Sequence, residues 1–216
     1  MAAGRVSVNG APERDADRWI DLESDTVSLD GKPLLSPPPV YVILHKPAGV
    51  LTTLRDKKER RTVYDLLPEE LRSLRYVGRL DQETTGVLLL TNDHTLAERM
   101  TNPRFKVPKT YRVRVERPLT AEEIQRLADG IELSDGRTRP AEVKAAAGDA
   151  SLIDVTITEG RNRQVRRMLE AVGNGVLSLE RIAFGPLGLG ELGPGEYRRL
   201  SADEVETLRS ESASEI

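Results

Sequence analysis

An aspartate between two glycines is the first residue of this sequence whose setting could support catalysis. Asp81 lies in a loop bounded by Gly78 and Gly86, directly before the apolar run Val87–Thr91. Glycines let a loop backbone come close to another molecule, and an arginine close to the carboxylate would help to keep it ionised. An ionised carboxylate in such a loop is able to act as a nucleophile or as a base. The alternative is that Asp81 only forms a turn or caps a helix.

A tyrosine within a basic strand is the second candidate. Tyr111 alternates with Arg112 and Arg114 in the segment Lys109–Glu116, a pattern typical of a half-buried strand. Aromatic residues make up only 4% of the chain, so a tyrosine among cations stands out. The pattern predicts an aromatic face on which an unpaired base stacks while the cations hold phosphates. The alternative is an ordinary core tyrosine.

Several arginines follow a glycine turn later in the chain. The segment Glu159–Met168 reads Glu-Gly-Arg-Asn-Arg-Gln-Val-Arg-Arg-Met, for which we predict a strand end, a turn at Gly160 and then a helix. Guanidinium groups at a helix N-terminus form an anion site, either for phosphate or for a catalytic carboxylate. Arginines in that position oppose the helix dipole, a cost that favours a functional role. An amphipathic helix with a basic solvent-facing side fits the same periodicity.

Charge is separated along the chain although its net value is only −3. Arg104–Arg117 carries six Lys or Arg against one Glu, and Arg55–Arg61 carries five against two acids. The end of the chain, Ser201–Ile216, carries five acids and one Arg. This separation predicts a basic groove on an acidic body, although charges that merely solvate exposed faces would look similar.

Composition and spacing argue against several other classes. The chain has no cysteine, and its two histidines, His45 and His94, are far apart without ligand-spaced partners, so we expect no metal site. No apolar run approaches the ~20 residues needed to cross a bilayer. Met1–Arg5 lacks the apolar core of a signal peptide. We therefore expect a cytoplasmic protein that makes no contact with a membrane.

A proline-rich connector suggests two parts. Residues 1–36 form a short acidic unit in which Asn9-Gly10 and Asp30-Gly31 each indicate a hairpin turn. Residues 37–39 are three prolines, which remove backbone donors and favour an extended linker. We expect a larger domain over residues 40–200 and a final helix with an acidic, disordered end over residues 201–216.

Strands and helices alternate in the larger part without regular βαβ order. Apolar or alternating segments predict strands at 40–44, 87–91, 109–116, 153–157 and 176–184. Apolar periodicity and capping residues predict helices at 62–67, 94–100 after Asn92 or Asp93, 120–128, 161–172 and 201–209. The layout is mixed α+β, without an internal repeat.

Taken together, these segments resemble the RsuA/RluB-type family of ribosomal RNA pseudouridine synthases. The resemblance runs through about residues 40–200 and rests on four motifs in the same order: His45-Lys46-Pro47 with Gly49 and Val50, Gly78-Arg79-Leu80-Asp81, Lys109-Thr110-Tyr111, and Gly160-Arg161-Asn162-Arg163-Gln164-Val165-Arg166-Arg167-Met168. Residues 1–36 look like the second half of the small RNA-binding domain that usually precedes this catalytic domain, with the first half missing.

The resemblance implies a fold and an activity. The fold is the α+β pseudouridine synthase fold, a mixed, largely antiparallel central sheet flanked by helices and loops. The activity is an isomerisation in which the N-glycosidic bond of a uridine is cut, the base is turned and C5 is joined to the sugar, with no metal or other cofactor. Because C5 is buried in a helical stack, the nucleotide is expected to flip into a pocket.

Residue roles follow from the resemblance. Asp81 is the catalytic carboxylate, as nucleophile or as base, and Arg166 is its ion-pair partner. Tyr111 stacks on the base and assists the late removal of the C5 proton. Further substrate contacts are expected from Arg79, Leu80, Lys109, Arg161, Arg163, Gln164, Arg167 and Leu179. The expected partner of this monomeric enzyme is ribosomal RNA, with the large subunit favoured, or a pre-ribosomal particle.

The competing hypothesis is a non-catalytic RNA-binding or ribosome-assembly protein that retains the synthase fold. It would share the basic clusters and the tyrosine. A binder has no use for a carboxylate that repels phosphates, so the intact set of Asp81, Tyr111 and Arg166 favours the enzyme. A glycosidase of small molecules is disfavoured because it would normally need a pair of placed carboxylates.

Overall fold

The computed structural model describes residues 4–21, 24–35, 37–146 and 148–211, with the side chain of residue 211 also left out. The chain separates into two compact units, Met1–Pro38 and Pro39–Ile216. The first unit contains one antiparallel sheet in the order β2-β1-β3-β4. Its strands are β1 (Val6–Val8), β2 (Ala11–Pro12), β3 (Val27–Leu29) and β4 (Lys32–Pro33). The acidic end of the chain, residues 212–216, lies outside the described residues.

Both hairpin turns expected in the first unit are present. Asn9 and Gly10 join β1 to β2, Asp30 and Gly31 join β3 to β4, and all four residues have positive φ. Asn, Asp and Gly are the residues that accept this backbone conformation most readily. Val8 is the only buried apolar side chain among the described residues of this unit. So small a core gives little stability by itself, and the assignment to half of an RNA-binding domain stays a prediction.

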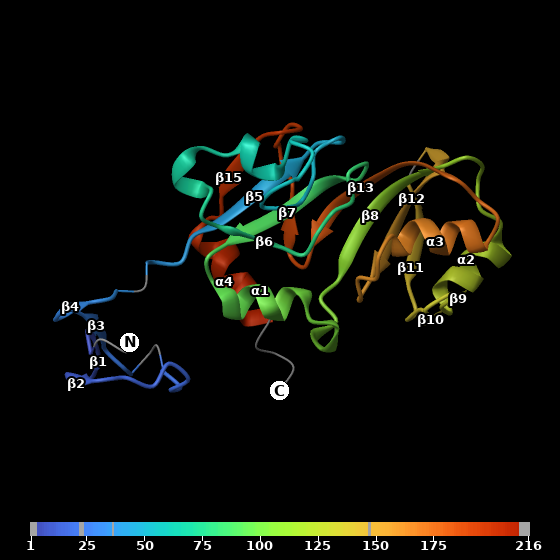
Figure 1. Cartoon of the computed structure of the whole chain (residues 1–216). Coiled ribbons are helices and arrows are strands. Elements are labelled where there is room, and N and C mark those ends of the chain that lie inside the picture. The colour runs from blue at the N-terminus through green and yellow to red at the C-terminus, as the bar shows by residue number, and fades with distance from the viewer. Residues whose placement is uncertain (1–3, 22–23, 36, 147, 212–216) are drawn as a thin grey trace. The chain divides into compact units, whose positions relative to one another are not determined.

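A nine-stranded sheet forms the body of the second unit (Figure 1). Its strands are β5 (Tyr41–Lys46), β6 (Arg75–Val77), β7 (Thr85–Thr91), β8 (Lys109–Val115), β11 (Glu142–Ala146), β12 (Asp149–Ile157), β13 (Val176–Phe184), β14 (Leu187–Gly188) and β15 (Tyr197–Arg199). The main order is β11-β12-β8-β13-β7-β5-β15, and all neighbours are antiparallel except β13 and β7. A mixed, largely antiparallel sheet was the expected α+β architecture, and it is confirmed.

The one parallel pair depends on a glycine. Gly86 on β7 pairs with Arg181 on β13 and has a φ of 110°. A side chain at this position would clash with the backbone of Arg181. Only glycine therefore lets the two strands approach here, and their pairing sets the loop that precedes β7 beside β13.

Within the described residues, four α-helices pack on the sheet. They are α1 (His94–Thr101), α2 (Ala121–Ala128), α3 (Gln164–Ala171) and α4 (Ala202–Glu211). The expected caps are present: Asp93 accepts from the Leu96 amide, and Thr120 forms a capping box with Glu123. The helix expected at 62–67 is a short 3₁₀ turn, η1 (Val63–Leu66), because Pro68 follows it closely. The other 3₁₀ turns are η2 (Glu69–Leu71) and η3 (Pro103–Phe105).

The core consists of three apolar clusters. One packs α2 and α3 on β8, β11 and β12, a second packs η1 and η2 on β5 and β7, and a third packs α1 and α4 on β5, β6 and β7. A two-stranded hairpin of β9 (Glu132–Leu133) and β10 (Gly136–Arg137) follows α2. In Figure 1 this hairpin, α2 and α3 lie at the β11 end of the sheet, and α1 and α4 lie at the β15 end. None of the described helices has the length and apolar character to cross a bilayer.

Candidate active site

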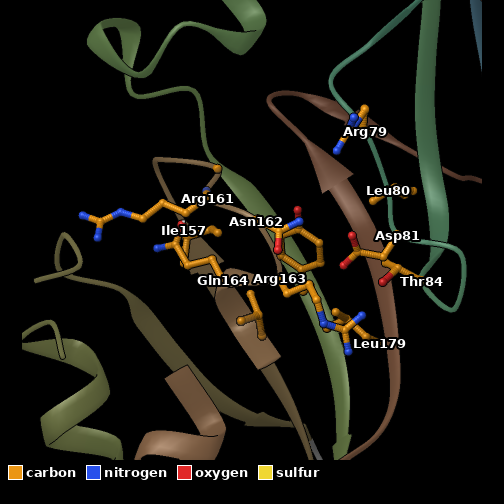
Figure 2. Close-up of a pocket in the computed structure, with 13 residues that line it drawn as sticks. Arg79, Leu80, Asp81, Thr84, Ile157, Arg161, Asn162, Arg163, Gln164 and Leu179 are labelled. Carbon is orange, nitrogen blue, oxygen red and sulfur yellow. Dashed lines mark hydrogen bonds between the residues drawn. The ribbon is translucent and has the colours of Figure 1, made fainter. Parts of the chain in front are cut away.

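A cavity of about 240 Å³ opens where β7, β8, β12 and β13 come close to the start of α3. Its walls come from segments far apart in the sequence, as Figure 2 shows. They are Arg79–Asp81 and Thr84 before β7, Tyr111 on β8, Ile157 on β12, Gly160–Val165 at the start of α3, and Leu179 on β13. Three of the four sequence motifs therefore meet in one cavity.

Asp81 is half-buried, and its carboxylate is directed into the cavity (Figure 2). The residues on both sides of it are tied to a neighbouring loop. The Thr52 hydroxyl donates to the carbonyl of Leu80 at 2.9 Å, and the Gly49 amide donates to the carbonyl of Gln82 at 2.8 Å. These two hydrogen bonds fix the backbone that carries the carboxylate.

A fully buried lysine holds the turn after Asp81. The ammonium of Lys46 donates to the carbonyl oxygens of Thr84 at 2.8 Å and of Gln82 at 3.3 Å. Burial lowers the pKa of Lys46 to about 8, against the attraction of Asp81 and Glu83. The motif that contains Lys46 was visible in the sequence, but a role for this side chain was not.

After Lys46, a second buried cation is Arg181, which lies beside Tyr111. Arg181 lies opposite Tyr111 on the neighbouring strand β13 and is 2% exposed. Its Nε donates to the carbonyl of Val87 at 2.8 Å, and its guanidinium lies 4.6 Å above the ring of Phe184. Burial lowers the pKa of Arg181, while its interaction with the Tyr111 hydroxyl acts in the opposite direction. Sequence reasoning gave Arg181 no role.

Lys109 completes this group of buried cations but does not line the cavity. Its Nζ donates to the carbonyl of Val107 at 3.0 Å and lies 5.4 Å from the centre of the Phe184 ring. Burial, with a smaller contribution from the charge of Arg181, lowers the pKa of Lys109 to about 8. Within the described part of the chain, neither Lys109 nor Arg181 forms an ion pair with an acid. Lys109, which was expected to contact the substrate, therefore does not reach the cavity.

The arginine motif turns into α3 through Gln164. Arg163 is the residue before the helix and has a positive φ of 50°. Gln164 is buried, accepts from the Arg161 amide at 3.0 Å and donates to Glu159 at 2.7 Å. These bonds fix the turn in place of an ordinary side-chain cap. Gln164 lines the cavity as expected, but its side-chain amide is already engaged.

Two of the expected RNA contacts are held by the β9–β10 hairpin. Arg161 donates to the carbonyl of Gly136 at 2.7 Å, and Arg167 binds both carboxylate oxygens of Asp135 at 2.9 and 3.0 Å. In Figure 2 the Arg161 side chain points away from Asp81. The structure therefore does not direct these two guanidinium groups into the cavity, and RNA contact by either one stays a prediction.

The expected ion pair between Asp81 and Arg166 is not formed among the described residues. Because α3 begins only at Gln164, Arg163 is the residue that reaches across to the Asp81 loop, where it pairs with Glu83 at 3.3 Å. The Nε of Arg166 is buried without a hydrogen-bond partner. A backbone hydrogen bond, followed by the charges of Arg163 and Arg166, lowers the pKa of Glu83.

Three other residues expected at the site, Arg79, Leu80 and Leu179, do line the cavity. Leu80 and Leu179 are buried and line it, and Ile157 and Val165, which sequence reasoning missed, extend this apolar wall. Arg79 is exposed at the rim and has no ion pair among the described residues. An aromatic ring, an apolar wall, a carboxylate and a free guanidinium suit a nucleotide.

The basic face expected on β8 is largely neutralised. Arg112 binds Asp154 through two hydrogen bonds of 2.9 and 2.8 Å, and Arg114 binds Asp149 at 2.9 Å. Both acids lie on the adjacent strand β12. The expectation that these cations flank Tyr111 to hold phosphates is therefore not supported by their contacts.

The family model of RNA pseudouridylate synthases matches residues 40–171, which contain all four motifs. The chain belongs to this family. It is therefore an isomerase that converts uridine in RNA to pseudouridine.

Three named relatives of this pseudouridine synthase are similar over 79% to 96% of the chain. A ribosomal large subunit pseudouridine synthase B of Bacillus subtilis is 38% identical, with 96% of this chain and 86% of the relative covered. A ribosomal small subunit pseudouridine synthase A of Yersinia pestis is 36% identical, with 96% and 89% covered. A ribosomal large subunit pseudouridine synthase E of Xanthomonas campestris is 41% identical, with 79% and 100% covered.

A solved structure has the same fold. The crystal structure of a pseudouridylate synthase superposes with a TM-score of 0.75 at 33% identity and covers 96% of this chain and 90% of the other. The expected pseudouridine synthase fold is confirmed.

Proposed function

We propose that this synthase modifies a uridine of ribosomal RNA, with Asp81 as its catalytic carboxylate. The observation that carries the role of Asp81 is its place: it is the one acid among the described residues that line the cavity. The names of the relatives support ribosomal RNA as the substrate class. Two of the three relatives above act by name on the large subunit, so we propose large-subunit RNA.

The reaction requires one bond to break and another to form at the same sugar carbon. The bond from N1 of the base to C1′ is cut, the base turns, and a bond from C5 to C1′ replaces it. The proton on C5 leaves and a proton is added at N1, so nothing is transferred to or from another molecule. Asp81 would either attack C1′ or remove the proton from C2′, and a kinetic isotope effect with 2′-deuterated uridine would identify the second role.

Tyr111 and the apolar wall would hold the base while it turns. The ring of Tyr111 offers a stacking face, and Leu179 and Ile157 bury the opposite side of the base. A detached base needs walls without strong directional bonds, since it must rotate between two binding modes. The Tyr111 hydroxyl, with the charge of Arg181 behind it, would then assist the removal of the C5 proton.

The arginines would act on the RNA backbone and on Asp81. Arg79 has no ion pair within the described part of the chain, and the exposed pair of Arg163 and Glu83 is weak enough to exchange for a phosphate. Arg166 would meet Asp81 in the RNA-bound enzyme, because its Nε is buried without a partner and catalytic contacts often tighten on binding. We propose that the enzyme acts as a monomer in the cytoplasm on ribosomal RNA or a pre-ribosomal particle, and the names of the relatives support the RNA partner.

The test is release of tritium from ribosomal RNA transcripts labelled at uridine C5. We expect release by the unmodified protein and a loss of roughly 10² to 10⁴-fold or more for Asp81→Asn. Asp154→Asn is the matched control, since Asp154 pairs with Arg112 outside the cavity and should leave most of the activity. Equal release by the unmodified protein and Asp81→Asn would remove Asp81 from its role. RNA binding without release, on both transcripts and precursor particles, would favour a binding protein that retains the fold.

A further inference from the structure

A second cavity lies beside the first, along the segment that carries Asp81. It has a volume of about 290 Å³ and shares Arg79, Leu80 and Asp81 with the first cavity. Its opposite wall is the loop between β5 and η1, from Leu51 to Arg60. A polymer whose target unit occupies the first cavity would have to place a neighbouring unit close to the second.

The loop that forms this wall is held firmly at its base. The Leu51 amide donates to the carbonyl of Arg61 at 3.0 Å, and the Val63 amide donates to the carbonyl of Leu51 at 2.9 Å. The buried Thr52 hydroxyl joins the loop to Leu80, next to Asp81. The position of the loop is therefore set by the same contacts that position the carboxylate.

The charges of the loop divide into a paired and a free set. Arg60 binds both carboxylate oxygens of Asp56, at 3.0 and 2.7 Å, and the amides of Lys58 and Arg60 also donate to this carboxylate. The Arg60 pair holds the pKa of Asp56 well below its usual range. Asp56 is thus compensated and repels a phosphate only weakly.

The free cations are Arg55 and Arg79. Both line the second cavity, and among the described residues neither has an ion pair or a side-chain hydrogen bond. Arg79 lines both cavities, so an RNA strand that passes from one to the other must run past its guanidinium. Two uncompensated guanidinium groups on a fixed wall form a site for a phosphodiester.

We propose that the second cavity binds the nucleotide next to the target uridine, with its phosphate between Arg55 and Arg79. Thr53 and Gln82 also line this cavity, where the Thr53 hydroxyl donates to the carbonyl of Arg55 at 3.1 Å and the Gln82 side-chain amide donates to the carbonyl of Gly49 at 3.3 Å. The proposal rests on the proposed function, because it takes the cavity of Asp81 as the place of the uridine. The repulsion of Asp81 keeps the phosphate on the arginine side.

The same loop carries an exposed leucine next to Arg55. Leu54 precedes Arg55, and 62% of its surface is exposed. An apolar side chain beside a phosphate site stacks on an unpaired base or fills the gap left by a flipped one. Leu177 on β13 is also 62% exposed, and neither leucine lines either cavity, but only Leu54 adjoins Arg55, so Leu177 is a matched control for the loss of an exposed leucine.

Arg55→Gln tests the phosphate site, with Lys57→Gln as its control from the same loop, because Lys57 lines neither cavity. Filter binding of 16S and 23S transcripts would be measured against KCl concentration, together with kcat and KM for tritium release. For Arg55→Gln we expect the log–log salt slope to fall by about 1 and KM to rise several-fold, with kcat unchanged. Lys57→Gln should alter both much less. Equal effects of the two variants, or none for Arg55→Gln, would overturn the proposal.

Leu54→Ala against Leu177→Ala tests the exposed leucine of the loop. We expect Leu54→Ala alone to raise KM, while both variants keep the melting temperature of the parent. If the unmodified protein releases no tritium from any ribosomal RNA, the proposed function fails, and the salt slopes of Arg55→Gln and Lys57→Gln still decide the second cavity. If the unmodified protein is active and Arg55→Gln behaves like Lys57→Gln, only the second cavity is refuted.

Discussion

Two groups of cations surround the cavity, and they are stabilised in different ways. Lys46, Lys109 and Arg181 are buried and bind backbone carbonyls and the Phe184 ring. The arginines at α3 are nearer the surface, and Arg167 is neutralised by Asp135 of the β9–β10 hairpin. The number of cations in a motif therefore does not tell which of them meet RNA. Whether a cation is free to bind RNA depends on its acidic partners, and these partners lie on other elements of the fold.

If the buried cations set the geometry of the site, Lys46→Met should cause the largest loss of activity. The variant loses the hydrogen bonds to the carbonyls of Gln82 and Thr84, so the turn after Asp81 is freed. We expect kcat to fall about 10²-fold with little change in KM, because a displacement of about 1 Å is enough for such a loss. In an Asp81→Asn background, Lys46→Met should reduce kcat no further. A change in KM alone would place Lys46 in RNA binding instead.

Arg181→Met should have the next largest effect. It removes the positive charge beside the Tyr111 hydroxyl and leaves the carbonyl of Val87 without its donor. We expect a fall of about tenfold in single-turnover tritium release, since a hydrogen bond to a charged group contributes about 1.5–3 kcal/mol. In a Tyr111→Phe background the same substitution should have no further effect on the rate. An undiminished effect there would make Arg181 purely structural.

The buried lysines also predict how stability depends on pH. The pKa values of Lys46 and Lys109 are lowered to about 8, whereas an unfolded lysine has a pKa of about 10.4. Between these values the unfolded chain binds more protons, so stability rises with pH. We expect the free energy of unfolding to increase by about 1 kcal/mol for each lysine from pH 8 to pH 9. Urea titrations should show a smaller increase for Lys109→Met; an unchanged slope would contradict the low pKa.

The smallest effects separate free from paired arginines. Arg79→Gln should reduce the salt slope of RNA binding by about 1, because Arg79 has no acidic partner among the residues that the structure describes. Arg167→Gln should leave that slope nearly unchanged and should speed amide exchange in β9 and β10, because its partner Asp135 lies in the turn that joins these strands. If Arg167→Gln lowered the slope as much as Arg79→Gln, the pairing with Asp135 would not persist in the complex.

Sequence patterns predicted the elements whose signal is local. The apolar run before Thr91 and the alternation around Val155 are strands, and Asp93 and Thr120 cap helices as expected. The edge strand β11 was missed because Glu142–Ala146 is rich in Ala, Glu and Lys and does not alternate clearly. The hairpin of β9 and β10 was missed because each strand has only two residues.

The site could be predicted only in part. The motifs of Asp81 and Tyr111 do meet in one cavity, but the partner of each arginine depends on contacts between distant segments. One signal for a buried cation was present: Lys46 ends a strand that begins with the apolar run Tyr41–Leu44, and all six residues of the strand are buried. Such a lysine needs fixed acceptors, which a loop near the site supplies.

The parallel pairing of β7 with β13 has a consequence for the order in which the enzyme matures. The hydrogen bond from Arg181 to Val87 joins residues 94 positions apart, and Leu179 on the same strand closes the cavity. During synthesis, Asp81 and Tyr111 leave the ribosome well before the strand that completes their surroundings. Closing so long a loop is slow compared with forming local turns. The nascent chain therefore gains its ability to hold a uridine late, after most of its other elements have formed.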